Sequence, residues 1–264
     1  MVISSLSIIT SAAPNSYGIG VNIEGKAFNG EIDVRNYTTF VGIRKFSTAM
    51  YSDASVTYNT YTKTLTVKTD KLTLTATNGK NYIEANGRYL YSETPIYMIN
   101  GRMYVPVLLL AKAFDAKISW NNSTSSFNIT RGSGGILSGE QFYRQDEVYW
   151  LSKIISAEAR GEIMQGKLAV GNVVLNRVRS ASFPNTIYSV IFDKKNGAQF
   201  SPVSNGTIYN DATAESIIAA KMCLEGYTVS SGVLYFVNPK AAPNSWASKN
   251  RPYFAQIGNH AFYL

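Results

Sequence analysis

The chain has 264 residues, of which 45% are apolar and 16% are charged, a composition that excludes disorder over most of its length and favours two folded domains. One cysteine, Cys223, and one histidine, His260, exclude an intrachain disulfide and leave a zinc site without its usual ligands. The net charge of +8 favours an anionic partner, and in the absence of a Lys/Arg run an anionic wall polymer fits as well as nucleic acid.

The first 13 residues join a short apolar stretch to small residues, Ser11, Ala12 and Ala13. This order resembles the back half of a secretory signal peptide without its basic beginning; a disordered tail or a first strand is the alternative. No stretch of the sequence reaches the ~20 apolar residues of a membrane span. We therefore expect an exported protein with no transmembrane segment.

Residues 20–131 carry the pattern of a β-rich domain. Apolar and polar residues alternate over residues 56–77, with many Thr, Val and Tyr, as in half-buried strands. Three Asn-Gly pairs between residues 78 and 101 predict tight hairpin turns. The one convincing helix of this region is predicted from about Val107 to Ala116.

The same region contains an imperfect internal repeat. Residues 38–50 and 55–69 parallel residues 101–114 and 117–130, with Tyr58 at the place of Trp120. The segment PIYMINGRMYVPVLLLAKAFDAKISWNNSTSSFNIT resembles the copper amine oxidase N-terminal-like domain, a stalk on many secreted bacterial proteins. The resemblance implies neither copper nor oxidase chemistry. We expect a βα-repeat stalk for spacing or wall attachment, whose tyrosines either stack on sugars or pack the sheets.

A glycine- and serine-rich stretch follows this domain. Residues 132–141 have little apolar content and predict a linker. From residue 142 the pattern becomes helical: a helix begins near Asp146 and places apolar residues at helical spacing up to Ile155. Glu158 then lies near the C-terminal end of this helix.

Residues 142–264 contain further helical segments. They are predicted from about Met164 to Ser180, shortly after Pro184, and from a cap at Asp211 or Thr213 to Glu225-Gly226. Gly166 and Gly171 indicate close helix approach, and Cys223 is predicted to be a buried structural thiol. Because LYFVN and the C-terminus predict short strands, the fold class is α+β: a β-rich domain followed by a mainly helical one with a small β excursion.

Several separate motifs of the second domain occur in a recognisable order. They are AEARGE, GKLAVGNVVLNRV, FPNTIYSVIF, AQFSP, LYFVNPK, the region of Trp246 and IGNHAFY. Together they resemble the SleB/CwlJ cell wall hydrolases, which include spore-cortex-lytic enzymes. The resemblance implies a lysozyme-like fold that cleaves the MurNAc-GlcNAc β-1,4 bond of peptidoglycan. It further implies a lytic transglycosylase, which leaves a 1,6-anhydro product.

Glu158, the first glutamate of AEARGE, corresponds to the catalytic glutamate of that family. The residues themselves support the same assignment, because a carboxyl held by an apolar helix face has a raised pKa and can donate a proton to the glycosidic oxygen. One acid/base suffices for a transglycosylase, since the sugar's own hydroxyl serves as the nucleophile. A second carboxylate is therefore not obligatory.

Three candidates for substrate binding lie in the motifs AEARGE and AQFSP. Glu162 is placed to position a water or the substrate, but Gly161 indicates that the helix stops there, which favours a salt bridge from Glu162 to Arg160 or Arg177. The resemblance places Gln199 and Phe200 of AQFSP in the substrate cleft, with a structural loop as the alternative.

Three more candidates lie towards the C-terminus. Tyr235 and Asn238 are predicted on a strand with one side towards sugar and the other towards the core. Trp246 is either a stacking platform for a pyranose ring or a packing residue. His260 is predicted to be a hydrogen-bonding residue that pins the C-terminus.

The expected partner is peptidoglycan of the spore cortex or of the vegetative wall, together with an unidentified regulatory protein. No cofactor, no metal and no nucleic acid are expected, and the expected location is the cell wall or the spore cortex and coat region. A stalk replaces the small peptidoglycan-binding domain that the resemblance leads us to expect, so roles in germination and in vegetative remodelling both stay open. The alternatives are a noncatalytic wall-binding or structural protein and a muramidase that hydrolyses with water.

Overall fold

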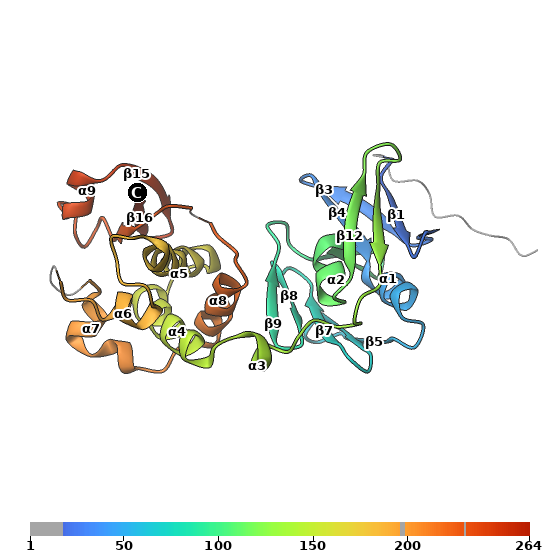
Figure 1. Ribbon diagram of the computed structural model, residues 1–264, viewed down its shortest axis with the longest axis horizontal. Coiled ribbons are helices and arrows are strands. Elements are labelled where there is room, and N and C mark those ends of the chain that lie inside the picture. Colours follow the sequence, from blue (N-terminus) through green and yellow to red (C-terminus); the bar gives the residue numbers. More distant parts are fainter. Residues whose placement is uncertain (1–17, 196–198, 230) are drawn as a thin grey trace, which may run out of the picture. The chain divides into compact units, whose positions relative to one another are not determined.

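A computed structural model describes residues 18–195, 199–229 and 231–264 of the chain. The chain divides into two compact units, Met1–Ser138 and Gly139–Leu264, and each is described by itself (Figure 1). The division falls inside the range predicted as a linker. The segment that resembles a signal peptide, residues 1–13, lies outside the described residues.

The described residues of the first unit, 18–138, form three β-sheets and two helices. Its sheets have the strand orders β12-β13-β1-β2, β10-β11-β4-β3 and β5-β6-β7-β8-β9. The elements are β1 (Gly20–Ile23), β2 (Lys26–Ala27), β3 (Ile32–Arg35), β4 (Thr38–Gly42), α1 (Ile43–Met50), β5 (Ser55–Asn59), β6 (Thr64–Lys68), β7 (Thr73–Thr77), β8 (Tyr82–Ala85), β9 (Arg88–Tyr91), β10 (Tyr97–Ile99), β11 (Arg102–Pro106), α2 (Val107–Ala113), β12 (Lys117–Asn121) and β13 (Ser126–Thr130).

The repeat seen in the sequence is a repeat of structure. The order β4-α1-β5-β6 returns as β11-α2-β12-β13, and the two hairpin turns are built alike. The side-chain oxygen of Asn59 accepts the N–H of Tyr61, and that of Asn121 accepts the N–H of Ser123, both at 2.9 Å. Two expectations were wrong: α1 is a second helix of this region, and α2 ends at Ala113, three residues earlier than predicted.

The segment predicted as a linker is partly held by the first unit. The side-chain amide of Asn86 donates to the carbonyl of Ile136 at 2.9 Å, and the N–H of Ile136 donates to Ala113 at 3.0 Å. Ile136 itself is buried in the core of this unit. Residues 139–142 form the short helix α3 (Gly139–Phe142) at the start of the second unit.

The second unit is mainly helical, and its described residues include one three-stranded sheet of order β14-β16-β15. Helices α4, α5 and α8 pack against one another, and β14 and β15 contact α5. The elements after α3 are α4 (Gln145–Ala159), α5 (Met164–Arg179), α6 (Ile187–Ile191), α7 (Ser201–Asn205), the 3₁₀ helix η1 (Thr207–Tyr209), α8 (Ala214–Leu224), β14 (Tyr235–Val237), α9 (Trp246–Asn250), β15 (Tyr253–Ile257) and β16 (His260–Tyr263). The predicted α+β class, a β-rich part followed by a helical part with some sheet, is confirmed.

Close packing of the three long helices depends on Gly171 of α5. A Cβ atom there would lie 2.8 Å from Cys223 Sγ of α8 and 2.9 Å from Ile155 Cδ1 of α4. The predicted burial of Cys223 is confirmed, since its side chain is 1% exposed and burial raises the pKa of its thiol to about 12. Within the described ranges, no helix is both long and apolar enough to cross a membrane.

Candidate active site

Glu158 lies in the last turn of α4, as the sequence predicts. Leu151, Ile154 and Ile155 are fully buried, and the 3.6-residue period places Glu158 on the same face of the helix. The side chain is half-buried, and this burial raises the pKa of its carboxyl to about 7. Within the described part of the chain, no hydrogen bond or ion pair to the Glu158 carboxyl is found, so no such contact stabilises its charged form. A carboxyl in this state keeps a large protonated fraction at neutral pH.

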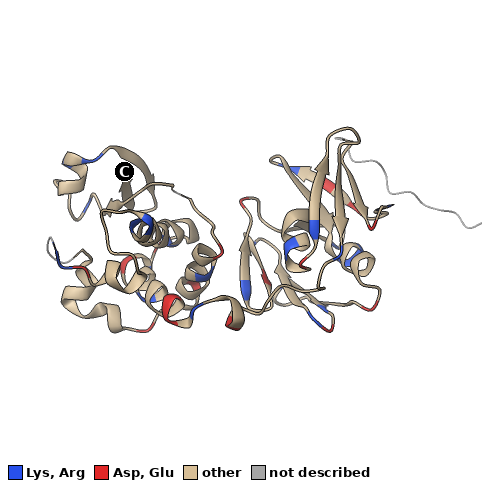
Figure 2. Ribbon diagram, viewed as in Figure 1, with Lys and Arg blue, Asp and Glu red and all other residues tan. Residues whose placement is uncertain are grey.

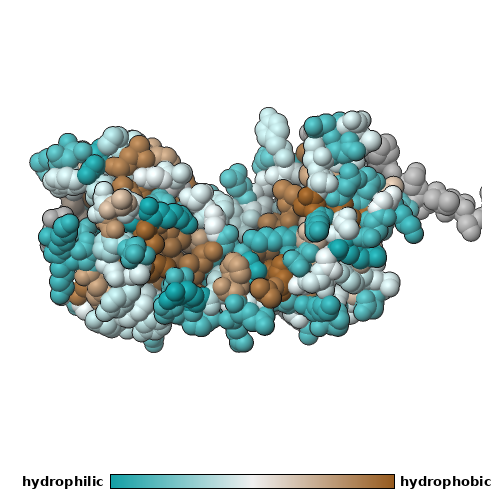
Figure 3. Space-filling model, in the orientation of Figure 1, coloured by the Kyte–Doolittle hydropathy of each residue, from teal (hydrophilic) through white to brown (hydrophobic). Residues whose placement is uncertain are grey.

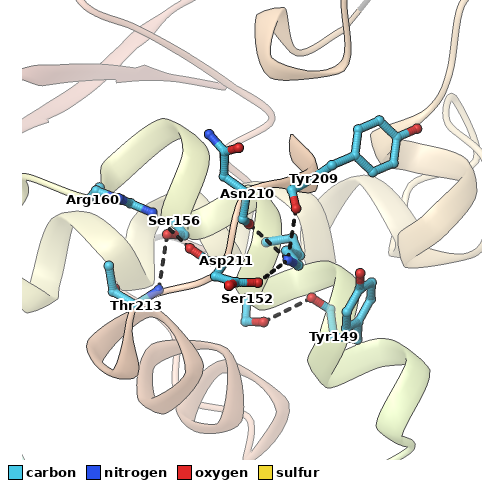
Figure 4. Close-up of polar contacts among 9 residues, drawn as sticks. Tyr149, Ser152, Ser156, Arg160, Tyr209, Asn210, Asp211 and Thr213 are labelled. Atoms are coloured by element: carbon cyan, nitrogen blue, oxygen red, sulfur yellow. Dashed lines mark hydrogen bonds and ion pairs between the residues drawn. The ribbon is translucent and has the colours of Figure 1, made fainter. Parts of the chain in front are cut away.

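The C-terminal half of α4 is fixed by the segment that precedes α8 (Figure 4). The buried ammonium of Lys153 donates to the carbonyls of Tyr209 and Asn210 at 3.2 and 2.9 Å. Arg160 donates to the carbonyl of Asp211 at 2.8 Å. These hydrogen bonds attach the last turns of α4 to the backbone carbonyls of residues 209–211. The Glu158 carboxyl takes no part in them.

Glu162 lies beyond the end of α4, where Gly161 predicted that the helix would stop. The predicted ion pair with Arg160 or Arg177 is wrong. The Glu162 carboxylate instead accepts two hydrogen bonds from Asn259, from its backbone N–H at 3.0 Å and its side-chain amide at 2.9 Å. Asn259 lies in the turn between β15 and β16, so this turn clamps the α4–α5 loop.

The surroundings of Glu162 favour its charged form. Burial alone would raise its pKa, but the hydrogen bonds from Asn259, the charge of His260 in its protonated state and the charge of Lys167 lower the pKa below its usual range. Gly258 has a positive φ of 60°, and a Cβ there would collide with the Glu162 carboxylate. The pKa values of Glu158 and Glu162, four positions apart, are thus shifted in opposite directions.

His260 was predicted to form a hydrogen bond that fixes the C-terminus, and its Nδ1 atom forms none to the described residues. This atom lies 3.9 Å from Glu162 Oε1 and is buried with no hydrogen-bond partner among the residues the structure describes. The ring packs edge-on against Phe236 at 5.3 Å. Burial lowers the pKa of His260, which favours the neutral imidazole.

Three of the predicted substrate residues gather around Arg177 of α5. Its guanidinium is buried, which lowers its pKa to about 10, and it donates to Gln199 Oε1 at 3.3 Å. The same guanidinium lies over the rings of Phe200 and Tyr235 at 5.2 and 5.4 Å. Arg177 therefore joins the AQFSP segment to strand β14.

Two of the predicted substrate residues have other tasks in the structure. Phe200 is 3% exposed and packs against Phe236, so its ring lies below the surface and is not placed to touch a sugar. Asn238 follows β14, and its side-chain oxygen accepts the N–H of Lys240 at 3.0 Å. It shapes a turn, and its offset of three from Tyr235 puts the two side chains on opposite sides of an extended chain.

Trp246 is the most exposed of the predicted substrate residues. It begins α9 with 58% of its surface accessible and contacts the Tyr235 ring at 5.6 Å. Arg251 lies over both rings, at 5.1 and 4.9 Å. Together they form an aromatic surface beside a cation. Figure 3 shows that hydrophobic and hydrophilic residues are mixed on one face of the second unit.

Other features of the second unit lie away from Glu158. A cavity of about 320 Å³ is lined by Trp150, Tyr188 and residues near the start of α4, among them Asp146 and Glu147. Red marks acidic residues at the start of this helix in Figure 2. None of the predicted site residues is among the described residues that line this cavity. No group of three His, Cys, Asp or Glu side chains suited to a metal ion occurs in the described ranges.

The sequence analysis did not predict the roles of three residues that organise the site. Asn259 holds Glu162, Arg177 collects Gln199 and Tyr235, and Lys167 donates from a buried position to the backbone carbonyl of Glu162. Asn259 belongs to the IGNHAFY motif and Lys167 to GKLAVGNVVLNRV. Their motifs were visible, but their partners lie in other segments of the chain.

Known proteins resemble both units. A family model described as Cell Wall Hydrolase matches residues 161–263, and one described as Copper amine oxidase N-terminal domain matches residues 21–129. The spore cortex-lytic enzyme of Oceanobacillus iheyensis is 35% identical over 147 residues, which are 54% of this chain and 51% of that protein. Cell wall hydrolase CwlJ of Bacillus subtilis is 30% identical over 124 residues, which are 44% of this chain and 84% of CwlJ. The chain belongs to the cell wall hydrolase family.

Both resemblances predicted from the sequence are thereby confirmed for this cell wall hydrolase family member. It is also 34% identical to the catalytic domain of the germination-specific lytic transglycosylase SleB from Bacillus anthracis, over 49% of this chain and all of that one, with a TM-score of 0.42. The chain spans about half the length of the spore cortex-lytic enzymes it matches, 51% and 45%. The family match begins at residue 161 and does not include Glu158. A catalytic role for Glu158 is therefore inferred from its position in α4 and its burial.

Proposed function

We propose that this member of the cell wall hydrolase family is a peptidoglycan-degrading glycosidase that cleaves the MurNAc-GlcNAc β-1,4 bond. The observation that carries the proposal is the Glu158 carboxyl, whose pKa burial raises to about 7 without an opposing charge or hydrogen bond among the described residues. Such a group is protonated when it meets a glycosidic oxygen and can give up its proton as the bond breaks.

The mechanism we propose is that of a lytic transglycosylase. Glu158 first protonates the leaving oxygen as a general acid and then, as a carboxylate, accepts the proton of the muramic acid 6-hydroxyl. That hydroxyl attacks the anomeric carbon, so a 1,6-anhydro ring forms without added water. One acid/base group suffices for both proton transfers.

Three of the other predicted residues would bind the glycan. We assign Trp246 and Tyr235 to stacking on pyranose rings, because Trp246 is exposed and the two rings are in contact. Gln199 is assigned to hydrogen bonding with sugar, and Phe200 and Asn238 support the site indirectly through packing and a turn.

A muramidase that hydrolyses with water is the second candidate, and the clamp on Glu162 favours it. This carboxylate is held ionised by Asn259, as a base that orients water would need to be. A noncatalytic wall-binding protein is the third candidate, and it assigns no role to the raised pKa of Glu158.

The proposed place of action follows from the relatives. A spore cortex-lytic enzyme and a cell wall hydrolase are both similar to this chain. We propose that the protein is exported and acts on peptidoglycan of the cell wall or of the spore cortex and coat region, in germination or in vegetative remodelling. A regulatory protein would keep the enzyme inactive before germination or wall remodelling begins.

The proposal is tested by the loss of turbidity of purified peptidoglycan suspensions with wild type and Glu158→Gln. Glu147→Gln, at the other end of α4, is the matched control because it removes the same charge from the same helix. Wild type and the control should clear the suspension, and Glu158→Gln should be at least about a hundredfold slower. Equal rates for Glu158→Gln and wild type would refute the assignment.

A further inference from the structure

A pocket of the first unit combines cations with an apolar floor. It has a volume of about 370 Å³ and lies between the sheet of β3, β4, β10 and β11, the strands β5 and β6, and helix α1. Leu65 and Met103, both nearly buried, form part of its floor. The volume lies at the lower end of the range for small-ligand sites.

The charges at this pocket are unbalanced. Arg44, Lys45 and Arg102 line it with a single carboxylate, that of Glu31. One oxygen of this carboxylate, Oε1, receives both Arg102 Nε at 2.9 Å and Lys45 Nζ at 3.2 Å. The four groups therefore sum to +2, and the pocket favours an anion.

Donor groups of the cations remain for a ligand. A guanidinium has five N–H donors and an ammonium has three. In the described residues, Arg44 uses one nitrogen for the carbonyl of Val56, at 3.0 Å, and Arg102 uses Nε for Glu31. Both guanidinium groups thus keep nitrogens that suit the paired oxygens of a carboxylate.

The pocket is preformed around its internal carboxylate. The Glu31 side chain is 16% exposed, and Gly42 of β4 leaves the space that it fills, since a Cβ at Gly42 would collide with Glu31 Oε2. Glu31 holds Lys45 and Arg102 at the pocket in the absence of a ligand. A ligand would bind to cations that are already placed, which lowers the entropic cost of binding.

We propose that the first unit binds a carboxylate-terminated peptide with small apolar side chains in this pocket. The guanidinium groups would receive the terminal carboxylate, while Leu65 and Met103 contact the apolar side chains. A neutral sugar offers no charge to Arg44 and Arg102, and a phosphate polymer offers no apolar group to the floor.

The peptides that branch from peptidoglycan have the required chemistry. That the natural ligand is a wall peptide rests on the proposed function, whereas the selectivity for a carboxylate rests on the pocket alone. Binding here would tether the chain to the polymer through the first unit, independently of any cleavage by Glu158.

Calorimetric titration of the full chain with N-acetyl-D-alanyl-D-alanine tests the proposal. The dipeptide should bind saturably, and its C-terminal amide should bind at least about tenfold more weakly. Arg44→Gln should weaken binding of the dipeptide by about tenfold, and Lys68→Gln, which removes one exposed charge of β6 outside the pocket lining, should leave it unchanged.

Three results would overturn the proposal: no saturable binding, equal binding of the amide, or equally tight binding of inorganic phosphate with the same dependence on Arg44. Cleavage of soluble glycan fragments by Arg44→Gln, measured in parallel, separates this proposal from the one for Glu158, because soluble fragments need no tether to the polymer. Lost dipeptide binding with a retained cleavage rate for soluble glycan fragments is the expected pattern.

Discussion

Replacement of Glu158 by Gln should stabilise the folded protein above neutral pH while it abolishes cleavage. Burial raises the pKa of Glu158 from 4.5 to about 7, so the native state binds a proton more tightly than the unfolded chain does. The stability that this proton contributes is fully present below the unfolded pKa and is lost as the pH rises through the folded pKa. Gln resembles the protonated carboxyl and keeps its stability at high pH.

The size of the effect follows from the two pKa values. The full shift corresponds to about 3 kcal/mol, and solvent at this half-buried carboxyl reduces the expected gain to about 1–2 kcal/mol at pH 8. In a unit of this size, that gain raises the Tm by about 3–10 °C.

Thermal unfolding of wild type and Glu158→Gln at pH 4, 6 and 8 measures the gain. Fluorescence of Trp150 and Trp246 reports on the second unit, although Trp120 of the first unit also contributes. The difference in Tm should be near zero at pH 4 and largest at pH 8, and Glu147→Gln should show no such rise. A Tm difference that is the same at all three pH values would refute the reasoning about Glu158.

Three further substitutions separate the roles of neighbouring residues. Asn259→Ala removes the side-chain hydrogen bond to the Glu162 carboxylate and keeps the one from the backbone N–H, so the free energy of unfolding from urea titration should fall by about 1–3 kcal/mol at pH 7. Because the pKa of Glu162 is lowered, this loss should shrink as the pH falls through that pKa; a loss that does not shrink at any pH down to acid unfolding would contradict the clamp. Trp246→Ala should raise the substrate concentration for half-maximal cleavage by about 2–10-fold with little change in Tm, as expected of an exposed stacking residue. Phe200→Ala should instead cost about 3–5 kcal/mol of stability, since the ring is buried; a Tm near that of wild type would contradict its structural role.

Much of the second unit could be predicted from local pattern. The apolar spacing of α4, the Thr213 cap and the close approach at Gly171 are each indicated by residues that are near one another in the sequence. Each of these features is found in the structure. The same holds for the position of Glu158 at the end of its helix. Helical periodicity and capping act over a few residues, so the sequence displays them directly.

The partner of Glu162 could not be predicted in that way. Asn259 is 97 residues further along the chain and reaches Glu162 only because the β15–β16 turn folds onto the α4–α5 loop. Sequence proximity favoured Arg160, whose guanidinium instead binds the carbonyl of Asp211. A contact between residues this far apart produces no pattern in the local sequence from which it could be predicted.

Helix α1 was missed although the repeat contained the signal. Residues 43–50 occupy the place that α2 takes in the second copy, but IRKFSTAM lacks the run of leucines that made α2 evident. Because the two copies of the repeat correspond, the helix predicted in the second copy also predicts a helix at residues 43–50 of the first. The error at Asn238 has a simpler cause, since strand periodicity is two and the offset from Tyr235 is three.

The central claim, cleavage of the glycan by Glu158, is tested most directly by mass spectrometry of the muropeptides released from vegetative and spore peptidoglycan. Wild type should release fragments that end in 1,6-anhydromuramic acid, and Glu158→Gln should release none. Reducing ends from wild type would assign the muramidase reaction with water. The same fragments from Glu158→Gln, or no fragments from wild type on either substrate, would contradict the account.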